Sequence, residues 1–116
     1  MTQWNDTQPI FLQIRQQIIT LILDGTVAEG AAVPSIRQIA TDLSVNPLTV
    51  TKAYQSLVDT GIVEKKRGLG MYVKEGARAA LLAQEREKFL HEEWPRILQQ
   101  VEALGLKVQD LMGEDK

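Results

Sequence analysis

The segment SIRQIATDLSVNPLTVTKAYQSLVDTG, residues 35–61, decides the fold, because two short amphipathic patterns follow each other in it with almost no chain between them. The first pattern begins at Ser35, which has the spacing of a helix capping box with Gln38. Apolar residues then follow on one face as far as Leu43. The pattern predicts a short helix from about Ser35 to Leu43.

The second pattern predicts another helix, over residues 46–60. Asn46 is a favourable N-cap residue, and Pro47 suits the first helical position, where its missing N–H costs nothing. Gly61 supplies the C-terminal stop. The apolar residues at helical spacing are Val50, Ala53, Tyr54, Leu57 and Val58. Two short helices joined by such a tight turn form a helix-turn-helix.

A β-hairpin is predicted directly after this pair. The β-prone runs IVEKK and MYVK flank RGLG, residues 67–70, in which Gly68 and Gly70 allow positive φ. A helix-turn-helix followed at once by a hairpin is the order of a winged helix. The net charge of the chain is -2, yet residues 52–74 hold five Lys or Arg against two Asp or Glu, so a local basic patch remains.

The flanking segments complete the predicted architecture. Apolar residues at helical spacing predict a helix from Pro9 to Asp24, and residues 26–33 leave room for a short edge strand. Residues 76–94 are strongly helix-prone, and Pro95 is expected to interrupt them and begin another helix. The predicted fold is mostly α with a small β-hairpin: an N-terminal winged helix-turn-helix, residues 1–75, and a short C-terminal helical dimerisation region, residues 76–116.

The tail helices have too few apolar positions to form a core of their own. They need a partner, which is either the winged helix or a second copy of the chain. We predict that the tail forms a homodimer interface. The residues predicted to contribute to it are Leu81, Leu82, Phe89, Trp94, Ile97, Leu98, Val101 and Leu104.

Catalytic and metal chemistry have no visible residue set. Cysteine is absent, and the single His91 lies among charged residues of a solvated helix with no nucleophile or orienting group near it. We therefore predict no enzyme, no catalytic residue, no metal site and no cofactor. The chain start lacks the pattern of a signal peptide, and no apolar run is long enough for a membrane span, so we expect a cytoplasmic protein with no membrane contact.

Double-stranded DNA is the partner that the remaining pattern favours. The leading end of a recognition helix meets base edges, and exposed N–H groups there are expected to attract phosphate. On helix 46–60 the outward residues are Asn46, Leu48, Thr49, Thr51, Lys52 and Gln55. The hairpin tip concentrates Lys65, Lys66 and Arg67 on a small-residue loop able to approach the minor groove.

The stretch VPSIRQIATDLSVNPLTVTKAYQSLVDTGIVEKKRGLGMYV resembles the winged helix-turn-helix of GntR-family bacterial transcription regulators. The VNPxTVxxAYxxLxxxGIVxxxRGxGxxV form with a short helical tail is similar to the YtrA subfamily. The resemblance implies a homodimeric, sequence-specific repressor of its own operon, often a transporter operon, that binds a near-palindromic operator. It places DNA contacts at Ser35, Arg37, Asn46, Leu48, Thr49, Thr51, Lys52, Lys66, Arg67, Gly68, Leu69 and Gly70.

The chain departs from this resemblance on the recognition helix. Many relatives carry Arg where this chain has Pro47 and Thr51, and the subfamily commonly carries Asn in place of Leu48. Leu48 either touches a thymine methyl group or simply removes a polar contact. Fewer guanidinium groups predict a shallower salt dependence of binding.

A winged-helix module that docks a protein and does not bind DNA is the alternative, favoured by the acidic total charge. No small-molecule effector can be named from the sequence, since the apolar tail residues favour a dimer core over a ligand cage. Any signal is expected to act through the tail, by changing the spacing of the two DNA-binding heads.

Overall fold

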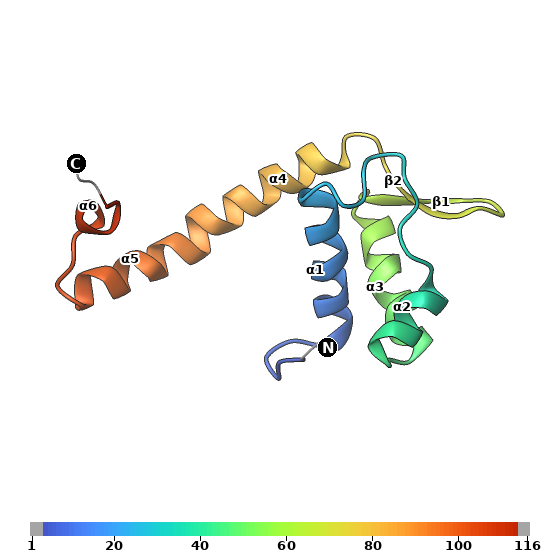
Figure 1. Cartoon of the computed structure of the whole chain (residues 1–116), viewed down its shortest axis with the longest axis horizontal. Helices are drawn as coiled ribbons and strands as arrows, with labels where there is room; N and C mark the ends of the chain where they lie inside the picture. Colours follow the sequence, from blue (N-terminus) through green and yellow to red (C-terminus); the bar gives the residue numbers. More distant parts are fainter. Residues whose placement is uncertain (1–3, 114–116) are drawn as a thin grey trace. The chain divides into compact units, whose positions relative to one another are not determined.

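The structure, a computed structural model, describes residues 4–113. These residues divide into two compact units, one ending at Leu81 and the other beginning at Leu82. The first unit contains α1 (Ile10–Leu23), α2 (Ile36–Leu43), α3 (Pro47–Asp59), β1 (Val63–Lys66) and β2 (Gly70–Val73) (Figure 1). The elements after the hairpin are α4 (Ala77–Lys88), η1 (Phe89–Glu93), α5 (Trp94–Ala103) and α6 (Val108–Leu111). The mostly helical fold with one antiparallel hairpin confirms the predicted fold class.

The helix-turn-helix is formed by local capping chemistry. Ser35 Oγ accepts the Gln38 N–H at 3.0 Å and begins α2. Ser44 ends this helix in the left-handed conformation, with φ of 56°. Asn46 then caps α3, which ends before Gly61. Because each helix start and stop is fixed by neighbouring residues, the short turn between α2 and α3 was predictable from the sequence.

The hairpin is extended by a third segment. β1 and β2 pair antiparallel, with Val63 opposite Val73. Ala32 forms an isolated bridge to Tyr72, and the Val33 N–H donates to the Met71 carbonyl at 3.0 Å. The connection between α1 and α2 thus provides the short edge pairing predicted for residues 26–33.

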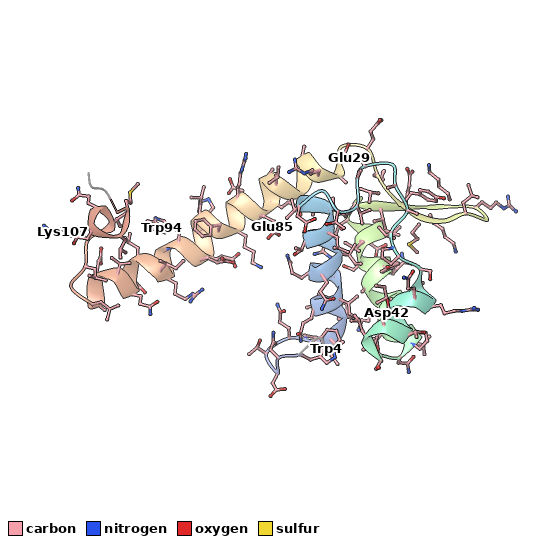
Figure 2. All side chains as sticks on the ribbon, in the orientation of Figure 1. Trp4, Glu29, Asp42, Glu85, Trp94 and Lys107 are labelled. Carbon is pink, nitrogen blue, oxygen red and sulfur yellow. The ribbon has the colours of Figure 1, made fainter. Side chains whose placement is uncertain are left out.

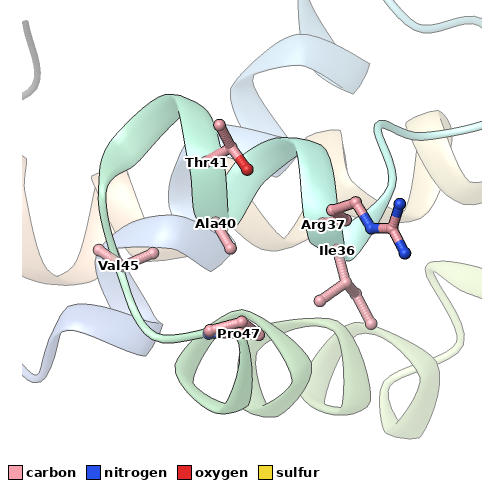
Figure 3. A pocket seen from close by; sticks show the side chains of 6 residues that line it. All are labelled: Ile36, Arg37, Ala40, Thr41, Val45 and Pro47. Carbon is pink, nitrogen blue, oxygen red and sulfur yellow. The ribbon is translucent and has the colours of Figure 1, made fainter.

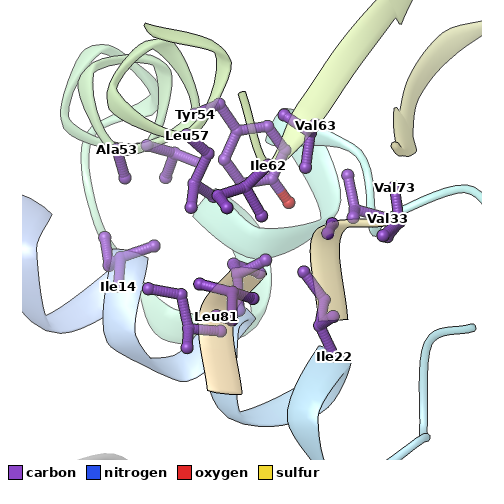
Figure 4. Close-up of a cluster of buried hydrophobic side chains, with 14 of the residues drawn as sticks. Ile14, Ile22, Val33, Ala53, Tyr54, Leu57, Ile62, Val63, Val73 and Leu81 are labelled. Atoms are coloured by element: carbon purple, nitrogen blue, oxygen red, sulfur yellow. The ribbon is translucent and has the colours of Figure 1, made fainter. Parts of the chain in front are cut away.

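One apolar core holds the first unit together (Figure 4). Tyr54 belongs to this core and is only 1% exposed. Its hydroxyl donates a hydrogen bond to the Pro34 carbonyl. The buried residues around it are Ile14, Ile18, Ile19, Ile22, Val33, Ala40, Val50, Ala53, Leu57, Ile62, Val63, Val73, Ala77 and Leu81. They come from all three helices, both strands and the first turns of α4, so the recognition helix is fixed by the whole unit.

The core reaches beyond the residue 75 at which we placed the end of the winged helix. Leu81, predicted as a dimer contact, is fully buried in the core of the first unit, so that prediction is wrong. The start of α4 is held there because the Arg78 N–H donates to Glu29 Oε2 at 3.0 Å. Glu29, labelled in Figure 2, belongs to the connection between α1 and α2. Arg78 Nε also donates to the Leu23 carbonyl at 3.1 Å. Hydrogen bonds from the N–H groups of Gly76 and Arg78 lower the pKa of Glu29.

The second unit is helical, and Pro95 is the second residue of α5, so the helix predicted to begin there is confirmed. The sequence did not show what lies before it, which is the π-helical turn η1 that joins α4 to α5 without a loop. The Trp94 N–H donates to the Phe89 carbonyl, five residues back, which is the π-type hydrogen bond. Proline lacks an N–H and clashes with the carbonyl four residues before it, so the widened turn accommodates Pro95 without ending the helix.

Candidate nucleic-acid interface

The start of α2 presents an exposed cation beside free backbone donors. Arg37 is exposed, and its guanidinium extends away from Ile36 and Ala40 (Figure 3). Within residues 4–113, no hydrogen-bond partner meets the N–H groups of Ile36 and Arg37. Two unpaired N–H groups and a guanidinium at one helix start form an arrangement suited to a phosphate.

The start of α3 differs from the start of α2, because its backbone donors are engaged. The Leu48 N–H donates to Asn46 Oδ1 at 2.8 Å. The N–H groups of Thr49 and Val50 donate to the Asn46 carbonyl at 2.9 and 3.4 Å, and Pro47 has no N–H. Our expectation of exposed N–H groups at this end is therefore wrong, since the Asn46 cap and Pro47 together remove them.

Several polar side chains predicted to face DNA on α3 also have partners within the chain. The Thr51 hydroxyl donates to the Pro47 carbonyl at 2.9 Å. The Lys52 ammonium lies 4.3 Å from the centre of the Phe11 ring on α1, a cation–π distance. Thr49 is only partly exposed. The sequence did not show these contacts, because the partner of Lys52 comes from a distant part of the chain.

A strongly exposed residue at the leading end of α3 is apolar. Leu48 is 76% exposed and is not part of the apolar core. Its position as the second residue of α3 follows from the Asn46 cap and Pro47. The outward surface of the helix start is therefore less polar than the residue types alone suggested.

The wing tip is a tight, exposed turn. The Leu69 N–H donates to the Lys66 carbonyl at 2.9 Å, and Gly68 has φ of 74°, as the predicted glycine turn requires. Arg67 is exposed, and Leu69 is 66% exposed. The Lys66 ammonium lies 4.7 Å from the centre of the Tyr72 ring, which positions it along the hairpin.

Two grooves connect these three regions. A groove of about 540 Å³ lies between α2 and α3, with Arg37 and Pro47 on its rim (Figure 3). A second groove, of about 190 Å³, joins Ser35 to Gly70 of the wing. Both grooves are lined by Ile36, so the start of α2 adjoins both the head of α3 and the wing.

Lys65, predicted as part of the basic hairpin but not as one of the DNA contacts implied by the family resemblance, lines the second groove beside Ser35 and Gly70. Strand alternation could have indicated this placement. Lys65 and buried Val63 are two residues apart on β1, so their side chains leave the same face of the hairpin. That face is turned toward α2 and Tyr54, which makes Lys65 a candidate for the interface.

The chemistry of the remaining residues is limited. In the part of the chain that the structure describes, no group of three His, Cys, Asp or Glu side chains could hold a metal ion. His91 Nε2 pairs with Glu87 Oε1 at 2.9 Å on an exposed helical surface. No helix within residues 4–113 is long and apolar enough to cross a membrane.

A sequence profile described as "Bacterial regulatory proteins, gntR family" matches residues 11–73, which span α1 to the end of the wing. The chain belongs to the GntR family. The family resemblance inferred from the sequence is thus confirmed, and the winged helix is the DNA-binding part of a GntR-type transcriptional regulator.

The relatives of this GntR protein are transcriptional regulators and not enzymes. It is 45% identical over 74 residues to the HTH-type transcriptional repressor YtrA of Bacillus subtilis, covering 64% of this chain and 57% of YtrA. It is 30% identical over 110 residues to the HTH-type transcriptional regulator YhcF of the same organism, covering 95% of this chain and 89% of YhcF. A GntR family transcriptional regulator from Listeria monocytogenes has a similar structure, with a TM-score of 0.74, 29% identity and 94% of each chain covered.

Proposed function

We propose that this GntR-family regulator is a homodimeric, cytoplasmic repressor that binds a near-palindromic DNA operator. In the proposal, α3 enters the major groove and the wing tip approaches the neighbouring minor groove. The observation that carries it is the pair of grooves sharing Ile36, which bring Arg37, the head of α3 and the strands of the wing at Lys65 and Gly70 next to one another. The name of YtrA supports repression, and the resemblance suggests the protein's own operon, often one for a transporter, as the target.

The proposed phosphate contacts follow from the unpaired groups. Arg37 and the N–H groups beside it supply a charged anchor at the start of α2. Arg67 and Lys66 supply charge at the wing tip, where the small residues Gly68 and Gly70 permit close approach. Such contacts fix the position of the protein on the duplex, and side chains at the head of α3 select the sequence.

Dimerisation through the second unit is supported by its apolar surface. Phe89 is 43% exposed with its ring stacked on Trp94, and Leu104 is 67% exposed. Only Val101 is buried among the described residues after Leu81. Leu82, Trp94, Ile97 and Leu98 are each partly exposed. An apolar surface of this kind on a short tail is what a second copy of the chain would cover.

The proposal is tested by titrating the purified protein against the DNA upstream of its own gene. We expect a retarded complex that forms at lower protein concentration than with scrambled DNA and that weakens as salt is raised. If the protein bound the upstream DNA and the scrambled DNA equally at every salt concentration, operator binding would be overturned. Tight binding to a protein partner that survives removal of the Lys66 and Arg67 charges, without DNA affinity, would favour a protein-docking module instead.

A further inference from the structure

We propose that Leu48 is a specificity-determining residue that accepts the 5-methyl group of a thymine in the major groove. This inference rests on the proposed function, because it assigns a base feature to the surface that α3 presents. It starts from an anomaly in the structure, a large apolar side chain that is 76% exposed at the tip of a polar helix start.

Leu48 has no visible structural task in its own chain. It belongs neither to the buried core nor to the partly buried side chains packed on that core. Its backbone is nevertheless held firmly, since its N–H donates to Asn46 Oδ1 at 2.8 Å. Pro47, the residue before Leu48, has its own φ restricted by the proline ring. The Leu48 side chain therefore projects from a helix start whose backbone is fixed. A side chain on a fixed backbone position is well suited to a contact that must form in one geometry.

The neighbouring groups leave Leu48 as the main free feature of this surface. Asn46 Oδ1 is occupied by the cap, and the Thr51 hydroxyl donates its proton to the Pro47 carbonyl. The Lys52 ammonium lies over the Phe11 ring. The Thr51 hydroxyl would have to give up this bond before it could donate to a base edge, and the Lys52 ammonium would have to leave the Phe11 ring, whereas Leu48 needs no such change.

The major groove offers one apolar group on the edges of its bases, the C5-methyl of thymine. The other groups by which base pairs are distinguished there are hydrogen-bond donors and acceptors, which a leucine would desolvate without replacing the lost hydrogen bond. Leu48 therefore favours a thymine at its position in each half-site. Because both partners are apolar, the contact contributes through burial and depends little on salt.

The test uses a duplex selected by the protein from random DNA and then rebuilt with single thymines replaced by deoxyuridine. This replacement removes one methyl group and leaves the hydrogen-bonding edge intact. For wild type, one thymine in each half-site should respond, with affinity falling about four-fold per methyl group, or roughly fifteen-fold when both half-sites are changed. In Leu48→Ala the same replacements should change affinity less than about two-fold.

Leu69→Ala is the matched control, since it truncates the other exposed leucine of the interface, at the wing tip. Even if Leu69→Ala binds DNA more weakly overall, the ratio of its affinities for the thymine duplex and the deoxyuridine duplex should equal that of wild type. Failure to select any DNA would overturn the proposed function and this inference with it. Two results would overturn this inference alone. In the first, the protein selects DNA, but no deoxyuridine replacement weakens wild-type binding. In the second, the replacements weaken binding by Leu48→Ala as much as binding by wild type.

Discussion

The hydroxyl of Tyr54 donates a hydrogen bond to the backbone carbonyl of Pro34. Tyr54 belongs to α3, and Pro34 directly precedes Ser35, the cap of α2. One buried side chain thus connects α3 to the chain segment that directly precedes α2, the helix that carries Arg37 in its first turn. The surfaces proposed to contact phosphate and bases are therefore positioned by the same core, which favours a fixed spacing between them.

Replacing Tyr54 with Phe should remove this tie without leaving a large cavity. The Pro34 carbonyl loses its donor, so we expect the free energy of unfolding to fall by about 1 to 2 kcal/mol near neutral pH. Affinity for the selected operator should fall as well, because the turn before Arg37 is no longer held. Urea denaturation at pH 8 measures the first effect, and fluorescence anisotropy with labelled duplex measures the second.

The effect of Tyr54→Phe on the free energy of unfolding should depend on pH in the alkaline range. Burial raises the pKa of Tyr54 from 10.0 to about 12, so the folded state keeps a proton that the unfolded state releases. The stabilising effect is complete below pH 10 and is lost as the pH rises toward 12. The stability difference between wild type and Tyr54→Phe should therefore shrink between pH 8 and pH 11. A constant difference across this range would contradict the assigned role of burial.

Replacing Arg37 with Ala should weaken DNA binding by roughly tenfold on all sequences alike, since a phosphate contact carries no base information. The slope of log affinity against log salt should become shallower by about 0.9 for each protomer. The exposed Arg86, outside the proposed interface, provides the matched control Arg86→Ala. An unchanged slope in Arg37→Ala, with an unchanged thermal transition, would remove Arg37 from the interface.

Replacing Gly68 with Ala tests the wing turn. A Cβ at this position would meet no atom within 4 Å, so the cost comes only from the φ of 74°. We expect a loss of about 1 kcal/mol of stability together with weaker DNA binding. Gly68→Asn is the matched comparison, because asparagine adopts positive φ more readily. Alanine and asparagine variants with the same thermal stability would show that the turn conformation is not what requires glycine.

Replacing Leu104 with Glu tests dimerisation. Because Leu104 is 67% exposed in the single chain, the substitution should leave the protomer folded. In an apolar dimer interface the new charge should raise the dimer dissociation constant at least about tenfold. Sedimentation velocity measures it, with Gln99→Glu, at an exposed position of α5 on a different face from Leu104, as the control. Dissociation of both variants to the same extent, or of neither, would count against this interface.

The elements that the sequence predicted well depend on neighbouring residues. Ser35 and Asn46 cap the two helices as their types and spacing indicated, and Gly68 makes the wing turn. Such local chemistry can be recognised without the rest of the fold. The winged helix and its likeness to the GntR family followed from these features.

The features that the sequence did not predict depend on distant contacts or on geometry within a continuous helix. Leu81 lies in a helix whose apolar residues could face either unit, and the hydrogen bonds of Arg78 to Glu29 and Leu23 fix its first turns on the winged-helix core. Pro95 lies in the first turn of α5 as predicted, but the interruption before it is a π-helical turn, which the sequence did not indicate. Neither outcome has a signature in residue spacing.

The central claim is that a pair of these chains binds one operator with two recognition helices. Hydroxyl-radical footprinting of the selected duplex tests it most directly. We predict two protected half-sites whose centres lie one helical turn, about 34 to 36 Å, or a multiple of that distance apart. In Arg37→Ala both half-sites should become protected together, at a roughly tenfold higher protein concentration. A single protected half-site, or even protection along the whole duplex, would contradict the claim.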